Sequence, residues 1–310
     1  MGEVSLIRRH TARRAFRGAP TARARAWQWC VRLAGSVALL ALLVATATAT
    51  AAQPRRVVSM NLCTDQLAMN IAAPGQLVSV SYLSHNPTAS VMAAEARRYP
   101  VNHGQAEEVF LLRPDLVLAG TFTSRETVAL LRRLGHRVET FAPSSSFDDI
   151  RQRIVRLGKL LDREQHAREL ADQFTASATS LSAAAGRAKI AAPYYANSYT
   201  SGRGTLASEV VRRSGLINLG DRLGLEGTTR LPLEVLIMGQ PALVVTSRSY
   251  ATAPALAHET FSHPALRGVA GSAGVVPLPD KYWICGTPFT LEAVRRLRDA
   301  AGTLQRGRQP

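Results

Sequence analysis

Two stretches decide the fold of this chain: EEVFLLRPDLV at residues 107–117 and EVLIMGQPALV at residues 234–244. Each begins with a glutamate, which is followed seven positions later by proline and then by x-Leu-Val. Apolar residues stand at matching offsets: Val109 with Leu236, and Leu111 with Met238. The pattern predicts a short helix, a turn at the proline and a buried strand. Because the copies lie 127 residues apart, we expect one such unit in each of two lobes.

Short apolar runs rich in valine lie on both sides of the middle of the chain. We predict strands at residues 56–60, 77–80, 116–119, 138–141, 242–246 and 274–278. Helix-like stretches such as 64–71 and 124–134 lie between them, and Pro and Gly mark the joints. The alternation of short buried strands with helices predicts an α/β fold with parallel sheets.

Residues 146–186 have a different pattern, which joins a first α/β lobe at 53–145 to a second lobe at 187–310. Ser146 is a predicted N-cap, and two acids follow it in the first turn. An apolar stripe runs through Ile150, Ile154, Leu157 and Leu161. These features predict a single long backbone helix, with Asp162 as the place for a break. The alternative is two ordinary helices and a turn.

Residues 1–52 are predicted to be a leader. Residues 33–44 are apolar or small and carry no charge, arginines precede them, and an Ala/Thr tract follows. This order is typical of a signal peptide, cleaved near Ala51 or Ala52, and predicts a periplasmic protein. The alternative is a retained membrane anchor, although twelve residues span only about 18 Å as a helix against roughly 30 Å of hydrocarbon.

The composition excludes several classes of protein. Apolar residues make up 46% of the chain, which is enough for a sizeable core and argues against disordered, collagen-like and disulfide-scaffold proteins. The chain has 38 Lys+Arg against 22 Asp+Glu, but eight of the arginines lie in the leader. Elsewhere the basic residues are spread in Arg-Arg pairs with few aromatics between them, so we do not expect nucleic-acid binding.

The chain resembles the helical-backbone class of periplasmic binding proteins. The resemblance rests on two α/β lobes, a helical connection and one Glu-x6-Pro-x-Leu-Val unit per lobe. These proteins serve ABC importers of vitamin B12, iron-siderophores and haem. The resemblance covers about residues 55–300 and implies a ligand cleft between the lobes. Further matching stretches are residues 56–61, 135–138, 204–206, 215–219, and Trp283 before Gly286.

In that family an acid at the tip of each lobe pairs with arginines of the membrane permease. Motif position maps these acids to Glu107 and Glu234. The resemblance therefore implies docking on an ABC permease dimer in the inner membrane, where two negative charges orient the molecule. The alternative is that each acid only stabilises the first turn of a helix. The sequence alone does not separate the role of Glu108 from that of Glu107.

Ligands of open α/β sheets bind beyond the carboxyl ends of strands. We therefore expect ligand contacts from Asn61, Cys63, Tyr82, His85, Tyr199, Arg203, Trp283 and Cys285. Thr64 is a predicted N-cap, and the helix that it begins suits an anionic ligand group. The aromatic rings suit a macrocycle or an aromatic siderophore, or else they pack in the core. His85 is a candidate ligand for a metal centre in the cargo, or else a solvated turn residue.

Cys63 and Cys285 are the two cysteines that follow the leader. In an oxidising compartment such a pair suggests a disulfide, which would clamp the lobes. The alternative is two free thiols that contact the ligand. The distance between their Cα atoms decides, since a disulfide requires less than about 7 Å.

The resemblance thus implies a periplasmic solute-binding protein of an ABC importer, not an enzyme. The expected cargo is an iron complex (siderophore or haem) or cobalamin, so that iron or cobalt belongs to the ligand and no resident cofactor or metal is expected. The first alternative is an exported α/β enzyme with its active site in the same cleft, although no motif for a nucleophile or a catalytic metal is recognisable. The second is a membrane-anchored sensor or scaffold.

Overall fold

The computed structural model divides the chain into residues 1–52 and Gln53–Pro310. It describes residues 54–181, 188–247, 264–266, 268 and 274–306. The predicted leader and its cleavage point therefore lie outside the described residues. Within these ranges, no helix is long and apolar enough to cross a membrane.

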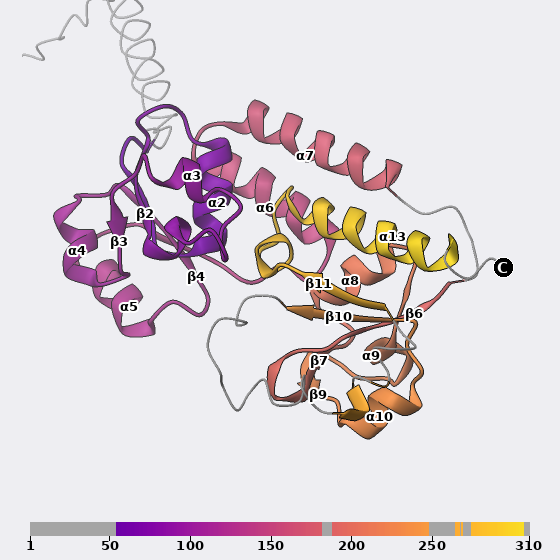
Figure 1. Cartoon of the computed structure of the whole chain (residues 1–310). Coiled ribbons are helices and arrows are strands. Elements are labelled where there is room, and N and C mark those ends of the chain that lie inside the picture. The colour runs from indigo at the N-terminus through magenta and orange to yellow at the C-terminus, as the bar shows by residue number, and fades with distance from the viewer. Residues whose placement is uncertain (1–53, 182–187, 248–263, 267, 269–273, 307–310) are drawn as a thin grey trace, which may run out of the picture. The chain divides into compact units, whose positions relative to one another are not determined.

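The first lobe is drawn in indigo to magenta in Figure 1. It contains a five-stranded parallel sheet with the order β3-β2-β1-β4-β5. Its strands are β1 (Val57–Ser59), β2 (Leu77–Ser81), β3 (Val101–Asn102), β4 (Leu116–Gly120) and β5 (Val138–Phe141). Its helices are α2 (Leu62–Ile71), α3 (Ala93–Ala96), α4 (Ala106–Leu111) and α5 (Arg125–Arg133), with the 3-10 turn η1 (Tyr82–His85) after β2. Alternate residues of the central strands enter different cores, Val57 one and Val58 the other, because both faces of the sheet are covered.

The second lobe contains a four-stranded parallel sheet with the order β11-β10-β6-β8 and a separate antiparallel pair, β7-β9. Its strands are β6 (Ile190–Pro193), β7 (Tyr199–Ser201), β8 (Ile217–Asn218), β9 (Thr228–Arg230), β10 (Leu243–Ser247) and β11 (Gly274–Leu278). Its helices are α8 (Leu206–Arg213), α9 (Leu219–Arg222), α10 (Leu233–Met238) and α13 (Thr290–Arg306), with the 3-10 turns η2 (Ala196–Ser198) and η4 (Asp280–Tyr282). The predicted fold class, two parallel α/β lobes, is confirmed.

The connection between the sheets is a pair of helices, α6 (Phe147–Leu160) and α7 (Glu164–Ser180), and not one continuous helix. The break falls at Asp162, whose φ is 55°. The two helices pack closely at Gly158, where only a residue without a side chain fits. A Cβ added there would lie 2.2 Å from the Cβ of Ala167. Ser146 caps α6 as predicted, in a capping box with Asp149. The prediction of a single helix is corrected because a turn folds α7 back onto α6.

The two copies of the repeated motif occupy equivalent places in the two sheets. Helix α4 leads into β4, which pairs with β1, and α10 leads into β10, which pairs with β6. The registers match, because Leu116 lies opposite Val57 while Leu243, which stands 127 residues after Leu116, lies opposite Ala191. The predicted unit of one helix, turn and strand per lobe is therefore confirmed.

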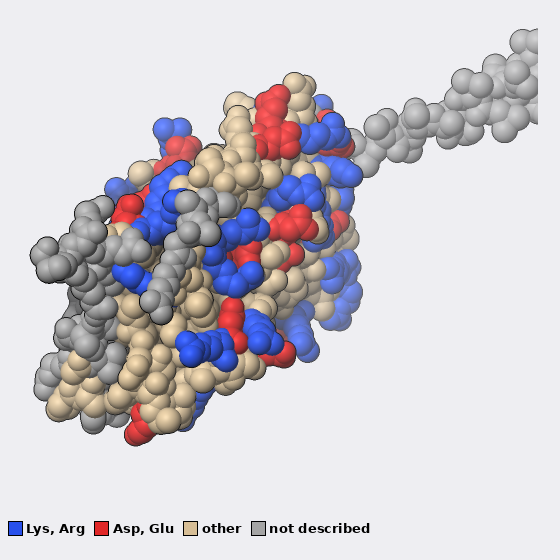
Figure 2. All heavy atoms as spheres, turned by 90° about the vertical axis from the view of Figure 1, so that its right-hand side faces the viewer, with Lys and Arg blue, Asp and Glu red and all other residues tan. Residues whose placement is uncertain are grey.

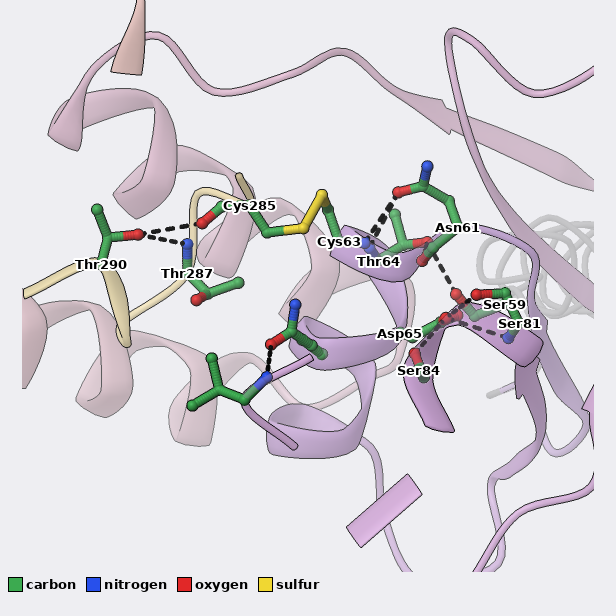
Figure 3. The surroundings of a disulfide bond; sticks show 12 residues. Ser59, Asn61, Cys63, Thr64, Asp65, Ser81, Ser84, Cys285, Thr287 and Thr290 are labelled. Atoms are coloured by element: carbon green, nitrogen blue, oxygen red, sulfur yellow. Dashed lines mark hydrogen bonds between the residues drawn. A yellow bond between two sulfur atoms is a disulfide. The ribbon is translucent and has the colours of Figure 1, made fainter. Parts of the chain in front are cut away.

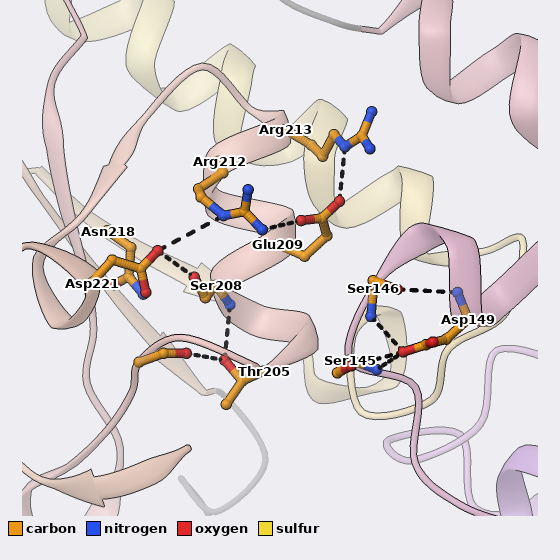
Figure 4. A network of polar contacts seen from close by, with 11 residues as sticks. Ser145, Ser146, Asp149, Thr205, Ser208, Glu209, Arg212, Arg213, Asn218 and Asp221 are labelled. Atoms are coloured by element: carbon orange, nitrogen blue, oxygen red, sulfur yellow. Dashed lines mark hydrogen bonds and ion pairs between the residues drawn. The ribbon is translucent and has the colours of Figure 1, made fainter. Parts of the chain in front are cut away.

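One hydrophobic core runs through both sheets and both linking helices. At its edge, the buried carboxylate of Glu209 on α8 accepts hydrogen bonds from Arg212 and, at 2.9 Å, from Nε of Arg213 (Figure 4). The Arg213 guanidinium also lies 5.2 Å from the ring centre of Phe147, the first residue of α6. These contacts tie the second lobe to the linking helices.

Charged side chains of both signs alternate on the face shown in Figure 2. Ion pairs of neighbouring turns occur within several helices, such as Arg296 with Glu292 at 2.8 Å in α13. Mixed charges of this kind are typical of solvated helix faces.

Candidate functional site

A pocket of about 280 Å³ lies beyond the carboxyl ends of β1, β4 and β5. The first lobe lines it with residues 61–64, 120–122 and 141–144, and the second lobe with residues 284–286. Its position is the one expected for the ligand site of a parallel sheet. Most of the lining is apolar, which suits a ligand with a large apolar surface.

A disulfide joins Cys63 to Cys285 (Figure 3). Both residues line the pocket. The Cα atoms lie 5.1 Å apart, within the range that a disulfide requires. The bond joins the first turn of α2 in one lobe to the loop before α13 in the other. Of the two alternatives that the sequence left open, the structure contains the bonded pair.

Asn61, not Thr64, is the N-cap of α2. Its Oδ1 accepts hydrogen bonds from the backbone amides of Cys63 at 3.0 Å and Thr64 at 3.4 Å. The Thr64 hydroxyl instead donates to the backbone oxygen of Asn61 and lies 2.8 Å from the Ser59 hydroxyl. The prediction of Thr64 as the N-cap is therefore corrected, because the helix begins two residues earlier, at Leu62, and the Asn61 side chain caps it.

Asp65 anchors the turn that follows β2. Its Oδ2 accepts hydrogen bonds from the Ser81 amide at 3.1 Å and from the hydroxyls of Ser81 and Ser84 at 2.6 Å each (Figure 3). Burial raises the pKa of Asp65 to about 7, because a desolvated carboxylate is disfavoured, while the serine hydrogen bonds lower it. The bonds hold η1, and with it Tyr82 and Leu83, against α2.

Arg153 on α6 is the one charged residue among the described residues that line the pocket. Burial lowers the pKa of its guanidinium. No hydrogen bond or ion pair of this side chain occurs among the described residues. The Ser144 hydroxyl, buried in the same lining, is likewise without a partner there. Asp149 on the same helix acts on this guanidinium electrostatically and raises its pKa. An anionic or strongly polar ligand group would find the hydrogen-bond donors of Arg153 without a partner among these residues.

Large apolar side chains at the pocket are exposed to solvent. Phe122 is 87% exposed, Ile284 57% and Leu83 39%, and all three belong to the lining. Nearby in the chain, the exposed ring of Tyr82 stacks on His103, with ring centres 5.3 Å apart. Exposed apolar surface beside a pocket is typical of a binding site.

The pocket brings together three of the eight expected ligand contacts: Asn61, Cys63 and Cys285. Trp283 is 6% exposed and packs in the core, with its ring 5.9 Å from that of Tyr195. Its neighbours Ile284 and Cys285 line the pocket instead.

The remaining expected contacts lie outside the lining of the pocket. Nε2 of His85 lies 3.0 Å from the backbone oxygen of Ala96, within the first lobe. The Arg230 guanidinium lies over the ring of Tyr199, 5.7 Å from the ring centre. Arg203 donates to a backbone oxygen at 3.2 Å. The structure therefore places these residues in local contacts, while Arg153, Phe122 and Ile284 are pocket residues that the sequence analysis missed.

The structure separates the roles of the two acids in α4. Glu108 accepts hydrogen bonds from the backbone amide of His103 at 2.7 Å and from Nδ1 at 3.0 Å, and these bonds lower its pKa. Glu107 and, in α10, Glu234 are exposed in the first turns of their helices. Neither carboxylate has a hydrogen bond or ion pair among the residues that the structure describes.

Residues 57–270 match the family described as periplasmic binding protein. A cobalamin-binding protein of Halobacterium salinarum is 28% identical over 221 residues, which cover 68% of this chain and 60% of that protein. This chain thus spans about 60% of the length of the curated relatives that it matches.

Solved structures share the two-lobed fold. The periplasmic vitamin B12-binding protein of Vibrio cholerae has a TM-score of 0.60 at 22% identity, covering 83% of this chain and 99% of that one. The periplasmic haem-binding protein of Roseiflexus sp. RS-1 has a TM-score of 0.64 at 21% identity, covering 80% and 99%. Together with a family match over more than half of its length, the repeat and the two sheets show that this chain belongs to the periplasmic binding protein family.

Proposed function

We propose that this chain captures a corrinoid in the pocket beneath the Cys63–Cys285 bond and delivers it to an ABC permease dimer in the inner membrane. The observation that carries the proposal is a largely apolar pocket that both lobes line. Arg153 is the one charged residue among the described residues of its lining. Binding and delivery need no covalent chemistry, and the cobalt is part of the cargo. The H. salinarum relative, named as a cobalamin-binding protein, supports this choice of ligand.

The size of the pocket supports a ligand that lies partly outside it. A volume of about 280 Å³ is slightly below that of most ligand pockets, so a macrocycle would enter with one edge only. The rest of its face would cover the exposed side chains of Phe122, Leu83 and Ile284. Flat apolar contacts of this kind give affinity without a deep cavity.

The chemistry of the lining favours a metal complex that brings its own ligands. Haem iron is usually held by a His, Cys, Met or Tyr side chain of the protein. The described lining consists of apolar, hydroxyl, amide and guanidinium groups, and its two cysteines are joined in the disulfide. The cobalt of a corrinoid carries its axial ligands with it, and the phosphate of its nucleotide loop suits Arg153.

The test is calorimetric titration of the purified chain from Gln53 onward, with its disulfide intact. The probes are cyanocobalamin, haemin and ferrioxamine B. We expect saturable one-to-one binding of cyanocobalamin with a Kd in the micromolar range or below. Phe122→Ala should weaken it about tenfold or more, while Leu134→Ala, at a half-exposed site on the end of α5, should leave it unchanged.

Other results identify another cargo or reject the proposal. Binding of haemin or ferrioxamine B alone would replace the corrinoid by that class and keep the carrier function. If a folded chain binds none of the three, the corrinoid proposal is overturned.

A further inference from the structure

The two repeated helices each end in a large apolar side chain that is almost fully exposed. Leu111 at the end of α4 is 78% exposed, and Met238 at the end of α10 is 81% exposed. Two positions earlier in each copy, Val109 and Leu236 are fully buried. The cores are therefore closed without Leu111 and Met238. Only Phe122, which lines the pocket, is more exposed among the large apolar residues that the structure describes.

Each exposed apolar residue stands beside an exposed acid. Leu111 follows Glu107 by four positions, and Met238 follows Glu234 by four. Residues four apart in an α-helix lie on the same face, one turn from each other. Each lobe thus presents a carboxylate and an apolar side chain as neighbours, and the carboxylate has no bond of its own among the described residues. Glu108, which is one position further on, is held by His103.

We propose that Leu111 and Met238 are the apolar anchors of a docking surface that they form with Glu107 and Glu234. The partner is a two-fold symmetric membrane protein with a cationic side chain beside an apolar pocket in each half. This inference rests on the proposed function, in which that partner is the permease dimer. The chain repeats the pair of side chains once in each lobe, and a two-fold dimer offers two equal receiving sites.

The two kinds of side chain have different tasks in such a contact. Exposed carboxylates attract a cationic partner over distance and raise the association rate, which falls with salt. An apolar side chain that enters a pocket acts after contact and slows dissociation. Loss of one anchor should raise the dissociation rate about ten- to a hundredfold.

The experiment measures binding of the purified chain to inner-membrane vesicles from the cells that encode it, by biolayer interferometry at several salt concentrations. We expect Leu111→Ser and Met238→Ser to raise the dissociation rate and to leave the salt dependence of association unchanged. Glu107→Gln and Glu234→Gln should lower the association rate and reduce its salt dependence. The matched controls are Leu134→Ser on the first lobe and Leu223→Ser on the second, which replace exposed leucines outside α4 and α10.

A second measurement identifies the partner. A photo-reactive phenylalanine analogue is placed at position 111 or 238 in living cells, and the cross-linked protein is identified by mass spectrometry. We expect the same polytopic membrane protein from both positions and none from positions 134 and 223. Each variant is first checked for an unchanged melting temperature and for cyanocobalamin binding, so that unfolding is recognised.

Failure of this inference differs from failure of the proposed function. If the glutamate variants weaken vesicle binding while Leu111→Ser and Met238→Ser do not, the anchors are rejected and docking through the acids stands. If the unaltered chain binds no vesicles and cross-links to no membrane protein, delivery to a permease is rejected as well. Cross-links to different proteins from the two positions also overturn the inference.

Discussion

Arg113 and Gln240 stand 127 residues apart, and both have a left-handed backbone, with φ of 47° and 43°. Each follows a short helix and precedes the proline of the repeated motif. Their amides donate to the carbonyl oxygens of Phe110 at 3.0 Å and Ile237 at 3.1 Å, three residues earlier in both cases. The repeat in the sequence is therefore a repeat of backbone conformation as well.

Replacement of either residue by glycine should stabilise the protein. A left-handed conformation is unfavourable for residues with a Cβ and free for glycine, so Arg113→Gly and Gln240→Gly should each raise the free energy of unfolding by up to about 1 kcal/mol. The matched control is Gln173→Gly on the exposed face of α7, which should lower it by about 1 kcal/mol. Urea denaturation measures all three. Destabilisation by both motif variants would contradict the shared conformation.

Removal of the Arg153 charge should weaken ligand binding. A charge-assisted hydrogen bond contributes about 1.5–3 kcal/mol, so Arg153→Gln should raise the Kd for an anionic ligand about 10- to 100-fold. Arg151→Gln is the control, because Arg151 lies on the same helix and is paired with Asp148 at 3.0 Å. Calorimetry at low and high salt measures the effect. An equal Kd for Arg153→Gln and the unaltered chain would mean that the guanidinium does not contact the ligand.

Reduction of the disulfide should lower the melting temperature. Removing a native disulfide typically costs about 2–5 kcal/mol, which for a domain of this size corresponds to about 5–15 °C. Thermal unfolding followed by circular dichroism, with and without reductant, tests this, and Cys63→Ser with Cys285→Ser should match the reduced chain. Thiol titration of the denatured, unreduced chain from Gln53 onward should find no free thiol. Two free thiols would show that the bond does not form.

Stability should fall as the pH rises toward neutral because of Asp65. Its folded-state pKa of about 7 lies above the ordinary 3.8, so the folded protein binds the extra proton. The stabilisation from this proton is complete below about pH 4 and is lost as the pH rises to about 7. Over that range the free energy of unfolding falls by at most about 1.4 kcal/mol per pH unit. Urea denaturation from pH 5 to pH 8 should show a shallower decline in Asp65→Asn, since asparagine mimics the neutral acid. The control is the exposed Asp148→Asn, and an identical pH profile for Asp65→Asn and the unaltered chain would refute the assignment.

Six strands could be predicted from the sequence because they are apolar runs bounded by Pro or Gly. The five others lack that signal. Strand β3 has two residues and β8 also has two, while β6 reads Ile-Ala-Ala-Pro and β7 and β9 are rich in Thr and other polar residues. The turn at Asp162 could not be predicted firmly. The helical spacing of apolar residues continues as far as Leu161, which directly precedes the break.

The candidate site was less predictable than the fold. The strand-end rule led to Asn61 and Cys63 after β1, and the same rule applied to β4 would have led to Phe122. Arg153 had no such signal, because it projects from the linking helix α6 and its place in the pocket depends on how the helix packs. The same rule also led to Trp283, whose ring the core buries, while its neighbour Cys285 lines the pocket.

The disulfide also bears on when the wall of the pocket is completed. Its two cysteines are 222 positions apart, so Cys63 leaves the ribosome long before its partner has been synthesised. The cytosol keeps thiols reduced, and a periplasmic protein meets an oxidising milieu only after export. In a chain exported as proposed above, this part of the pocket wall is therefore completed only once nearly the whole chain has crossed the membrane.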